Sequence, residues 1–234
     1  MSLEPRAPPS HTRGMQRRAP TRRTVAVLGA AAVATLLAPD RDVRSLFVLG
    51  DSWAAGLHAD PARALGQVAA ARLHWAVTVD AVSGTGYVTD AGGGAAYADR
   101  VARVEPSVRA DLVVVQGGSN DRDASQAELA AGARRTLRAL GSRFPAAPRV
   151  MLGPGPDPEP VTAEQRAVDD VLADVAEAEG VAYISMLRAA WIPSAPTRVL
   201  DPRNHHPTID GQAYLGLRLE QRLRGLYPRL TRSV

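Results

Sequence analysis

The chain has 234 residues, of which 45% are hydrophobic and only 4% aromatic, and its formal net charge is +4. This length and composition fit one globular domain with a core of Ala, Val and Leu, and they exclude a fibrous protein. The sequence contains no Cys and no Lys, which excludes disulfides, thiolate metal sites, cysteine nucleophiles, Schiff bases and P-loop phosphate sites.

The net positive charge of the chain comes from its N-terminal part. Residues 1–44 hold 8 of the 28 basic residues and 3 of the 24 acidic ones, a balance of +5, so residues 45–234 carry −1. A nucleic-acid site needs clustered cations on the folded part of a protein. We therefore expect no nucleic-acid partner.

The first 44 residues differ in composition from the rest. Residues 1–20 are rich in Pro and Arg and are expected to be disordered. The apolar run at 25–38 is short for a membrane span and typical of a signal-peptide core, and Arg22 with Arg23 before it resembles a twin-arginine export signal. The segment predicts a secreted or cell-surface protein, with the run either cleaved or kept as an anchor. A start at Met15, or a first helix of the fold, would instead indicate a cytoplasmic protein.

From residue 45 onward, strand-like and helix-like segments alternate. The strand-like segments are continuous apolar runs, which are typical of parallel strands buried on both faces. They lie at 45–50, 76–84, 111–118, 149–155 and 181–187. The sequence therefore predicts an α/β domain over residues 45–234, with its ligand site at the carboxyl ends of the strands.

Capping residues mark the starts of two helices. Ser125 with Glu128, and Thr162 with Gln165, each form a capping box before a run of apolar residues at helical spacing. A last helix is expected at about 209–226, and the Gly-rich segment 90–100 is expected to be a loop.

Three candidate residues follow the first three predicted strands. Ser52, in "GDSW", could be a nucleophile that also offers its backbone N–H to an oxyanion, or it could be a helix cap. Asn120, in "GGSND", could donate its amide to the same oxyanion, or it could simply tolerate a turn. Gly84 could supply a second backbone N–H, or it could form an ordinary glycine turn.

A general base for Ser52 is expected in "DPRNHHP", just before the last helix. His205 and His206 are the candidates, and Asp201 is the nearest acidic residue upstream. Two adjacent His cannot easily turn to one metal ion, so no metal is expected. His58 is interpreted as structural, because it flanks the first predicted helix.

In this order, the four stretches resemble the SGNH hydrolases, or GDSL esterase/lipase superfamily. "GDSWAAG" matches the first block of that family, Gly84 stands at the glycine of the second block, "GSND" matches the third and "HHP" the fifth. The resemblance implies a flavodoxin-like three-layer α/β/α sandwich and no cofactor. It also implies Ser52 as nucleophile, His206 as general base, and an oxyanion hole formed by Ser52 and Gly84 N–H with the Asn120 side chain.

The sequence departs from the family in the fifth block. The family usually has Asp three residues before its His, where Arg203 stands here. Either the loop bulges and Asp201 orients His206, or a backbone carbonyl orients it. We favour Asp201.

The predicted function is a serine esterase that hydrolyses acyl or acetyl esters of a small molecule or glycan through an acyl-enzyme. One alternative is a cell-envelope glycan O-acyltransferase that uses the same residues. The other is a non-catalytic surface binding domain of the same fold. Membrane association is expected only through residues 25–38.

Overall fold

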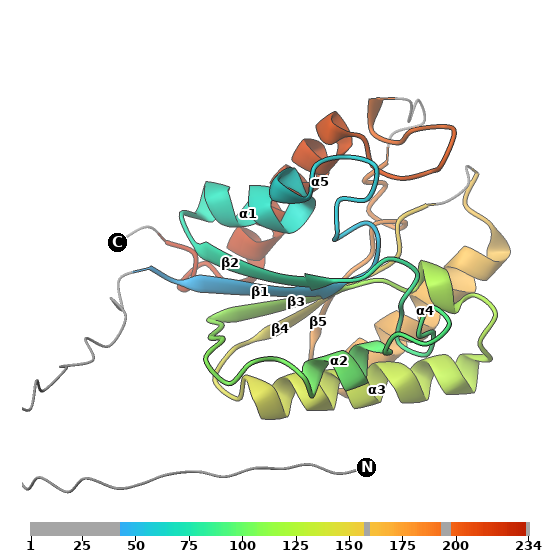
Figure 1. Ribbon diagram of the computed structural model, residues 1–234, viewed down its shortest axis with the longest axis horizontal. Coiled ribbons are helices and arrows are strands. Elements are labelled where there is room, and N and C mark those ends of the chain that lie inside the picture. The colour runs from blue at the N-terminus through green and yellow to red at the C-terminus, as the bar shows by residue number, and fades with distance from the viewer. Residues whose placement is uncertain (1–42, 157–159, 193–197, 233–234) are drawn as a thin grey trace, which may run out of the picture. The chain divides into compact units, whose positions relative to one another are not determined.

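The structure, a computed structural model, contains one sheet of five parallel strands in the order β2-β1-β3-β4-β5 (Figure 1). It describes residues 43–156, 160–192 and 198–232, so the expected export segment lies outside the described residues. The strands are β1 (Ser45–Gly50), β2 (Ala76–Ala81), β3 (Leu112–Gln116), β4 (Arg149–Leu152) and β5 (Ala182–Ile184). Because β1 lies between β2 and β3, its carboxyl end is flanked by the carboxyl ends of both.

Helices cover both faces of the sheet (Figure 1). One face carries α1 (Leu65–Leu73) and α5 (Ile209–Leu226), and the other carries α2 (Tyr97–Val101), α3 (Gln126–Arg143) and α4 (Ala163–Ala178). Two short 3-10 helices, η1 (Pro61–Arg63) and η2 (Ser119–Asp121), follow β1 and β3. The predicted three-layer α/β/α architecture with a five-stranded parallel sheet is confirmed.

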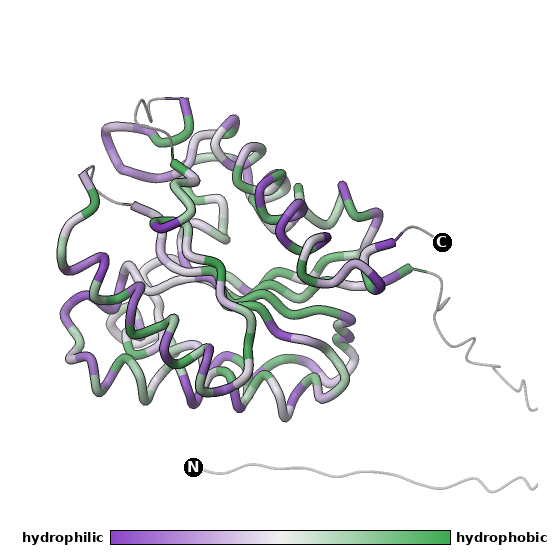
Figure 2. The backbone as a smooth tube through the Cα atoms, turned by 180° about the vertical axis from the view of Figure 1, so that it is seen from behind, coloured by the Kyte–Doolittle hydropathy of each residue, from purple (hydrophilic) through white to green (hydrophobic). Residues whose placement is uncertain are grey.

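The alternation of side chains along β1 divides the core into two layers. Leu46 and Val48 pack in the cluster that contains residues of α1 and α5, whereas Phe47 and Leu49 pack in the cluster that contains residues of α3 and α4. All four are at most 1% exposed. Successive side chains of a strand point to opposite faces, so a strand covered on both sides must be apolar throughout. Figure 2 shows this hydrophobic centre, with hydrophilic residues recurring along the helices around it.

Both predicted capping boxes are present. The Ser125 side chain accepts the Glu128 N–H while the Glu128 carboxylate accepts the Ser125 N–H, and Thr162 and Gln165 do the same at the start of α4. Replacing such a cap costs about 1 kcal/mol. None of the described helices is both long and apolar enough to span a membrane.

Strand ends were predicted less well than strand positions. The second strand stops at Ala81 and not at residue 84, because the Thr85 backbone N–H and hydroxyl both bond to the Val82 carbonyl and turn the chain. The segment 90–100, predicted as a loop, contains the start of α2 at Tyr97. Both corrections concern the loop that follows β2, where Gly84 lies.

Candidate active site

Ser52 lies in the first turn after β1. Asp51 Oδ1 accepts the Trp53 backbone N–H at 2.9 Å, and the Leu57 N–H donates to the Ser52 carbonyl at 3.0 Å. Gln212 of α5 donates its side-chain amide to the Trp53 carbonyl at 3.0 Å, and Ser52 itself is only 8% exposed. The strand end, this turn and α5 together fix Ser52 at the carboxyl edge of the sheet.

The His206 ring joins Ser52 to a backbone carbonyl. Its Nε2 lies 2.9 Å from Ser52 Oγ, and its Nδ1 lies 2.7 Å from the carbonyl oxygen of Asn204. A carbonyl oxygen can only accept, so Nδ1 carries the proton of the neutral ring and the Nε2 lone pair faces the serine hydroxyl. This is the arrangement that a general base for Ser52 requires.

Asp201 does not contact the His206 ring, which corrects the interpretation that we favoured. Its carboxylate accepts the Arg203 backbone N–H at 2.9 Å, Nε–H at 3.0 Å and Nη2–H at 2.7 Å. These hydrogen bonds and the guanidinium charge lower the pKa of Asp201 to about 2. The alternative, a carbonyl that orients the imidazole, is what the structure shows, and the carbonyl is that of Asn204.

The other two expected residues follow the strands on either side of β1. Gly84 has φ +78°, a conformation that favours glycine, and Asn120 Nδ2 donates to the Thr85 carbonyl at 2.9 Å. Among the described residues, neither the Ser52 nor the Gly84 backbone N–H makes a hydrogen bond, and the Asn120 amide keeps a second N–H. Three N–H donors are therefore available at the ends of three adjacent strands.

Asp121, the residue that follows Asn120, is buried. It is 0% exposed and accepts three backbone N–H groups of the loop after β2, at 2.9 to 3.0 Å. These groups belong to Tyr87, Val88 and Thr89. A Cβ at Gly86 would overlap the Asp121 carboxylate, so any other residue there would displace this carboxylate. Asp121 thus ties the Gly84 loop to the turn that carries Asn120.

A second buried carboxyl group lies beneath Ser52. Asp51 is 1% exposed, and its Oδ2 has no hydrogen-bond partner among the described residues. Burial raises the pKa of Asp51 to about 7, and the charge of Asp121 acts in the same direction. The Trp53 N–H, the Gln116 amide and the Arg100 charge offset only part of this rise.

His58 lies beside the proposed base, although we interpreted it as structural. Its ring stands edge-on to the His206 ring, with centroids 5.4 Å apart and an interplanar angle of 78°. No sequence pattern predicts this contact, because it depends on the left-handed conformation of His58, with φ +63°. A second imidazole therefore lies directly beside the His206 ring.

A cavity of about 250 Å³ adjoins the Asn120 turn. It lies between the end of β3 and the start of α4, and its lining includes Gly118, Ser119, Pro154 and Val168. Within the described ranges, no three His, Asp or Glu side chains gather into a group that could hold a metal ion.

The model of a family described as GDSL-like Lipase/Acylhydrolase matches residues 48–214, a span that includes Ser52, Gly84, Asn120 and His206. No curated protein sequence matches the chain significantly.

Several solved structures share the fold. Est24, a carbohydrate acetylesterase from Sinorhizobium meliloti, is 17% identical with a TM-score of 0.64, and the match covers 78% of this chain and 99% of that one. A family two carbohydrate esterase from Cellvibrio japonicus is 20% identical with a TM-score of 0.63, covering 80% and 62%. The native M. smegmatis aryl esterase is 17% identical with a TM-score of 0.62, covering 79% and 100%. At these identities the likeness shows the fold alone.

Proposed function

Because the chain belongs to the GDSL-like lipase/acylhydrolase family and is a hydrolase acting on esters, we propose that it cleaves carboxylic esters at Ser52 with His206 as general base. The observation that carries this proposal is the 2.9 Å contact between Ser52 Oγ and His206 Nε2, in a tautomer set by the Asn204 carbonyl.

In the first half of the reaction, Ser52 Oγ attacks the acyl carbon and passes its proton to His206 Nε2. The carbonyl oxygen of the ester becomes an oxyanion, which the Ser52 and Gly84 N–H groups and the Asn120 amide would stabilise. The intermediate then expels the alcohol, which takes the proton from His206, and an acyl-enzyme remains.

In the second half, His206 removes a proton from water, which attacks the acyl carbon of the acyl-enzyme. The tetrahedral intermediate collapses, Ser52 leaves with the proton from His206, and the acid is released. During both halves the imidazolium is stabilised by the Asn204 carbonyl and not by a carboxylate, since Asp201 is paired with Arg203. The proposed site is therefore a Ser-His pair with a backbone acceptor.

The proposed substrates are short acyl esters, including acetyl esters of carbohydrates. Of the three solved structures named above, two are described as carbohydrate esterases and one as an aryl esterase, which supports an ester of this kind. Release of acetate from an acetylated sugar, set against hydrolysis of p-nitrophenyl acetate and octanoate, measures this preference. Product analysis with an added sugar acceptor separates hydrolysis from acyl transfer.

The central test compares wild type with Ser52→Ala on p-nitrophenyl acetate. Ser107→Ala, which removes an exposed hydroxyl between α2 and β3, is the matched control. We expect loss of turnover in Ser52→Ala alone, and covalent labelling of wild type by a fluorophosphonate. Equal activity of Ser52→Ala and wild type would refute the proposal, and an unlabelled, inactive wild type would favour the binding-domain alternative.

A further inference from the structure

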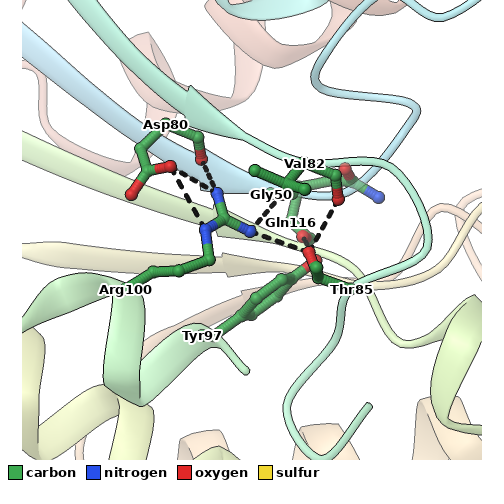
Figure 3. Close-up of polar contacts among 7 residues, drawn as sticks. All are labelled: Gly50, Asp80, Val82, Thr85, Tyr97, Arg100 and Gln116. Atoms are coloured by element: carbon green, nitrogen blue, oxygen red, sulfur yellow. Dashed lines mark hydrogen bonds and ion pairs between the residues drawn. The ribbon is translucent and has the colours of Figure 1, made fainter. Parts of the chain in front are cut away.

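Arg100 of α2 is buried against the strand ends that hold the candidate site (Figure 3). The residue is 6% exposed, and its Nη1 donates both to the Gly50 carbonyl, at 3.0 Å, and to Thr85 Oγ1, at 2.8 Å. Its Nη2 pairs with Asp80 Oδ1 of β2 at 2.6 Å. One guanidinium thus connects β1, β2 and the loop after β2.

The two Nη1 contacts lie directly next to the proposed oxyanion donors. Gly50 stands two residues before Ser52, and Thr85 follows Gly84. The Thr85 carbonyl also accepts the Asn120 amide at 2.9 Å. A displacement of Thr85 would therefore move the Gly84 N–H and the Asn120 side chain together, relative to Ser52.

A second ring of contacts fixes the guanidinium in place. Thr85 Oγ1, which accepts from Arg100, donates its own proton to the Val82 carbonyl at 2.7 Å. The centroid of the Tyr97 ring lies 5.4 Å from the Arg100 Cζ, and the Tyr97 hydroxyl donates to the Gln116 carbonyl at 2.8 Å (Figure 3). The Arg100 guanidinium thus donates to Gly50 and Thr85, and its position is further stabilised by the Tyr97 ring and by the Val82 carbonyl that anchors Thr85.

We propose that Arg100 is a positioning residue, whose Nη1 sets the spacing between the Ser52 turn and the Gly84 and Asn120 donors during ester hydrolysis. The inference rests on the proposed function, because it assigns a role in that reaction. Arginine suits this role because its planar group offers several donors in fixed directions, whereas lysine is a flexible point charge. A displacement of about 1 Å in a catalytic group can lower the rate by about a hundredfold.

The test removes the contact from each side. Thr85→Val deletes the hydroxyl but keeps the backbone carbonyl, and Arg100→Lys keeps the charge but loses the fork. For both we expect kcat to fall about ten- to a hundredfold with KM changed less than about twofold, since the donors act in the transition state. Thr85→Ser, which restores the hydroxyl, should return kcat to within about threefold of wild type.

Thr136→Val is the matched control for loss of a buried hydroxyl. Thr136 is also 0% exposed, and its hydroxyl donates to the Gly132 carbonyl within α3 at 2.9 Å. Its kcat should stay within about twofold of wild type, even where its melting temperature falls as far as that of Thr85→Val. In an Asn120→Ala background the effect of Thr85→Val should shrink, because the two changes act on one set of donors.

The outcomes separate the two claims. If wild type hydrolyses the ester and both Thr85→Val and Arg100→Lys keep wild-type kcat, the positioning role is overturned while the proposed function stands. A kcat loss in Thr136→Val as large as in Thr85→Val also overturns it, since instability alone would then explain the effect. If wild type hydrolyses no ester, the proposed function fails first and the positioning role fails with it.

Discussion

The carbonyl oxygen of Asn204 lies 2.7 Å from Nδ1 of His206, where serine hydrolases with a catalytic triad have a carboxylate. A neutral carbonyl fixes the tautomer as a carboxylate would, but it has no full negative charge with which to stabilise the imidazolium. The proposed base therefore depends on backbone geometry more than on a charged partner.

Asp201→Asn should reduce kcat/KM by less than about tenfold, because the carboxylate contacts Arg203 and not the His206 ring. Loss of the carboxylate from a true triad costs about 10⁴-fold. Ester hydrolysis by Asp201→Asn and by Arg203→Met measures the difference. A loss near 10⁴-fold in Asp201→Asn alone would show that Asp201 reaches His206 during turnover.

Asn120→Ala should lower kcat by about 10² to 10³ with little change in KM, as expected for one oxyanion donor. Steady-state kinetics on p-nitrophenyl acetate give both values. Because the variant also loses the bond to the Thr85 carbonyl, its unfolding must be measured in parallel. A rise in KM at constant kcat would instead assign Asn120 to substrate binding.

Asp121→Asn should destabilise the protein by about 2 to 3 kcal/mol, because an amide N–H₂ would replace one of the oxygens that accept backbone N–H groups. Denaturant unfolding measures the change. Asp174→Asn, on the exposed surface of α4, controls for the loss of one negative charge. Equal stability of the two variants would contradict the role assigned to Asp121.

Asp51 makes stability depend on pH. Its pKa in the folded protein is raised from 3.8 to about 7, so the buried carboxyl binds its proton more tightly when folded than when unfolded. Its contribution is fully present below pH 4 and is lost as the pH rises through 7, by up to about 4 kcal/mol. Relative to Asp51→Asn, wild type should therefore be more stable at pH 5 than at pH 8.

Denaturant unfolding of wild type and Asp51→Asn at the two pH values checks this prediction. Asp174→Asn again serves as the control, and its difference from wild type should be the same at both pH values. If the difference between wild type and Asp51→Asn also stays constant, Asp51 does not titrate in this range.

We also propose that the N-terminal segment directs export. Replacing both Arg22 and Arg23 by Lys should then retain the protein in the cytoplasm, because twin-arginine signals depend on the arginine pair. Cell fractionation with an antibody against the folded domain compares the variant with wild type. Export at the wild-type level would contradict a twin-arginine route.

The fold was predictable because its pattern is local. Runs such as Leu46 to Leu49 are apolar on both faces, and such strands need helices on either side. The order of the motifs also predicted that Ser52 and His206 lie close together, although 154 residues separate them in the sequence.

Contacts that depend on backbone conformation were not predictable. The His206 Nδ1 contacts the Asn204 carbonyl and not the Asp201 carboxylate. This contact depends on the backbone of the turn between them, in which His205 is left-handed, with φ +57°. Likewise, the acceptors of Arg100 lie 15 and 50 residues away in loops and strand ends. A motif of a few residues does not predict contacts between residues so far apart in the sequence.

The loop that carries His206 is closed on itself. The Asp201 N–H donates to the His206 carbonyl at 2.9 Å, and an antiparallel bridge joins Leu200 to Pro207 just outside it. The imidazole and the carbonyl that orients it therefore travel as one unit. If the loop moves as a unit, the contact between Nδ1 and the Asn204 carbonyl moves with it, so the tautomer of His206 does not depend on where the loop stands relative to Ser52.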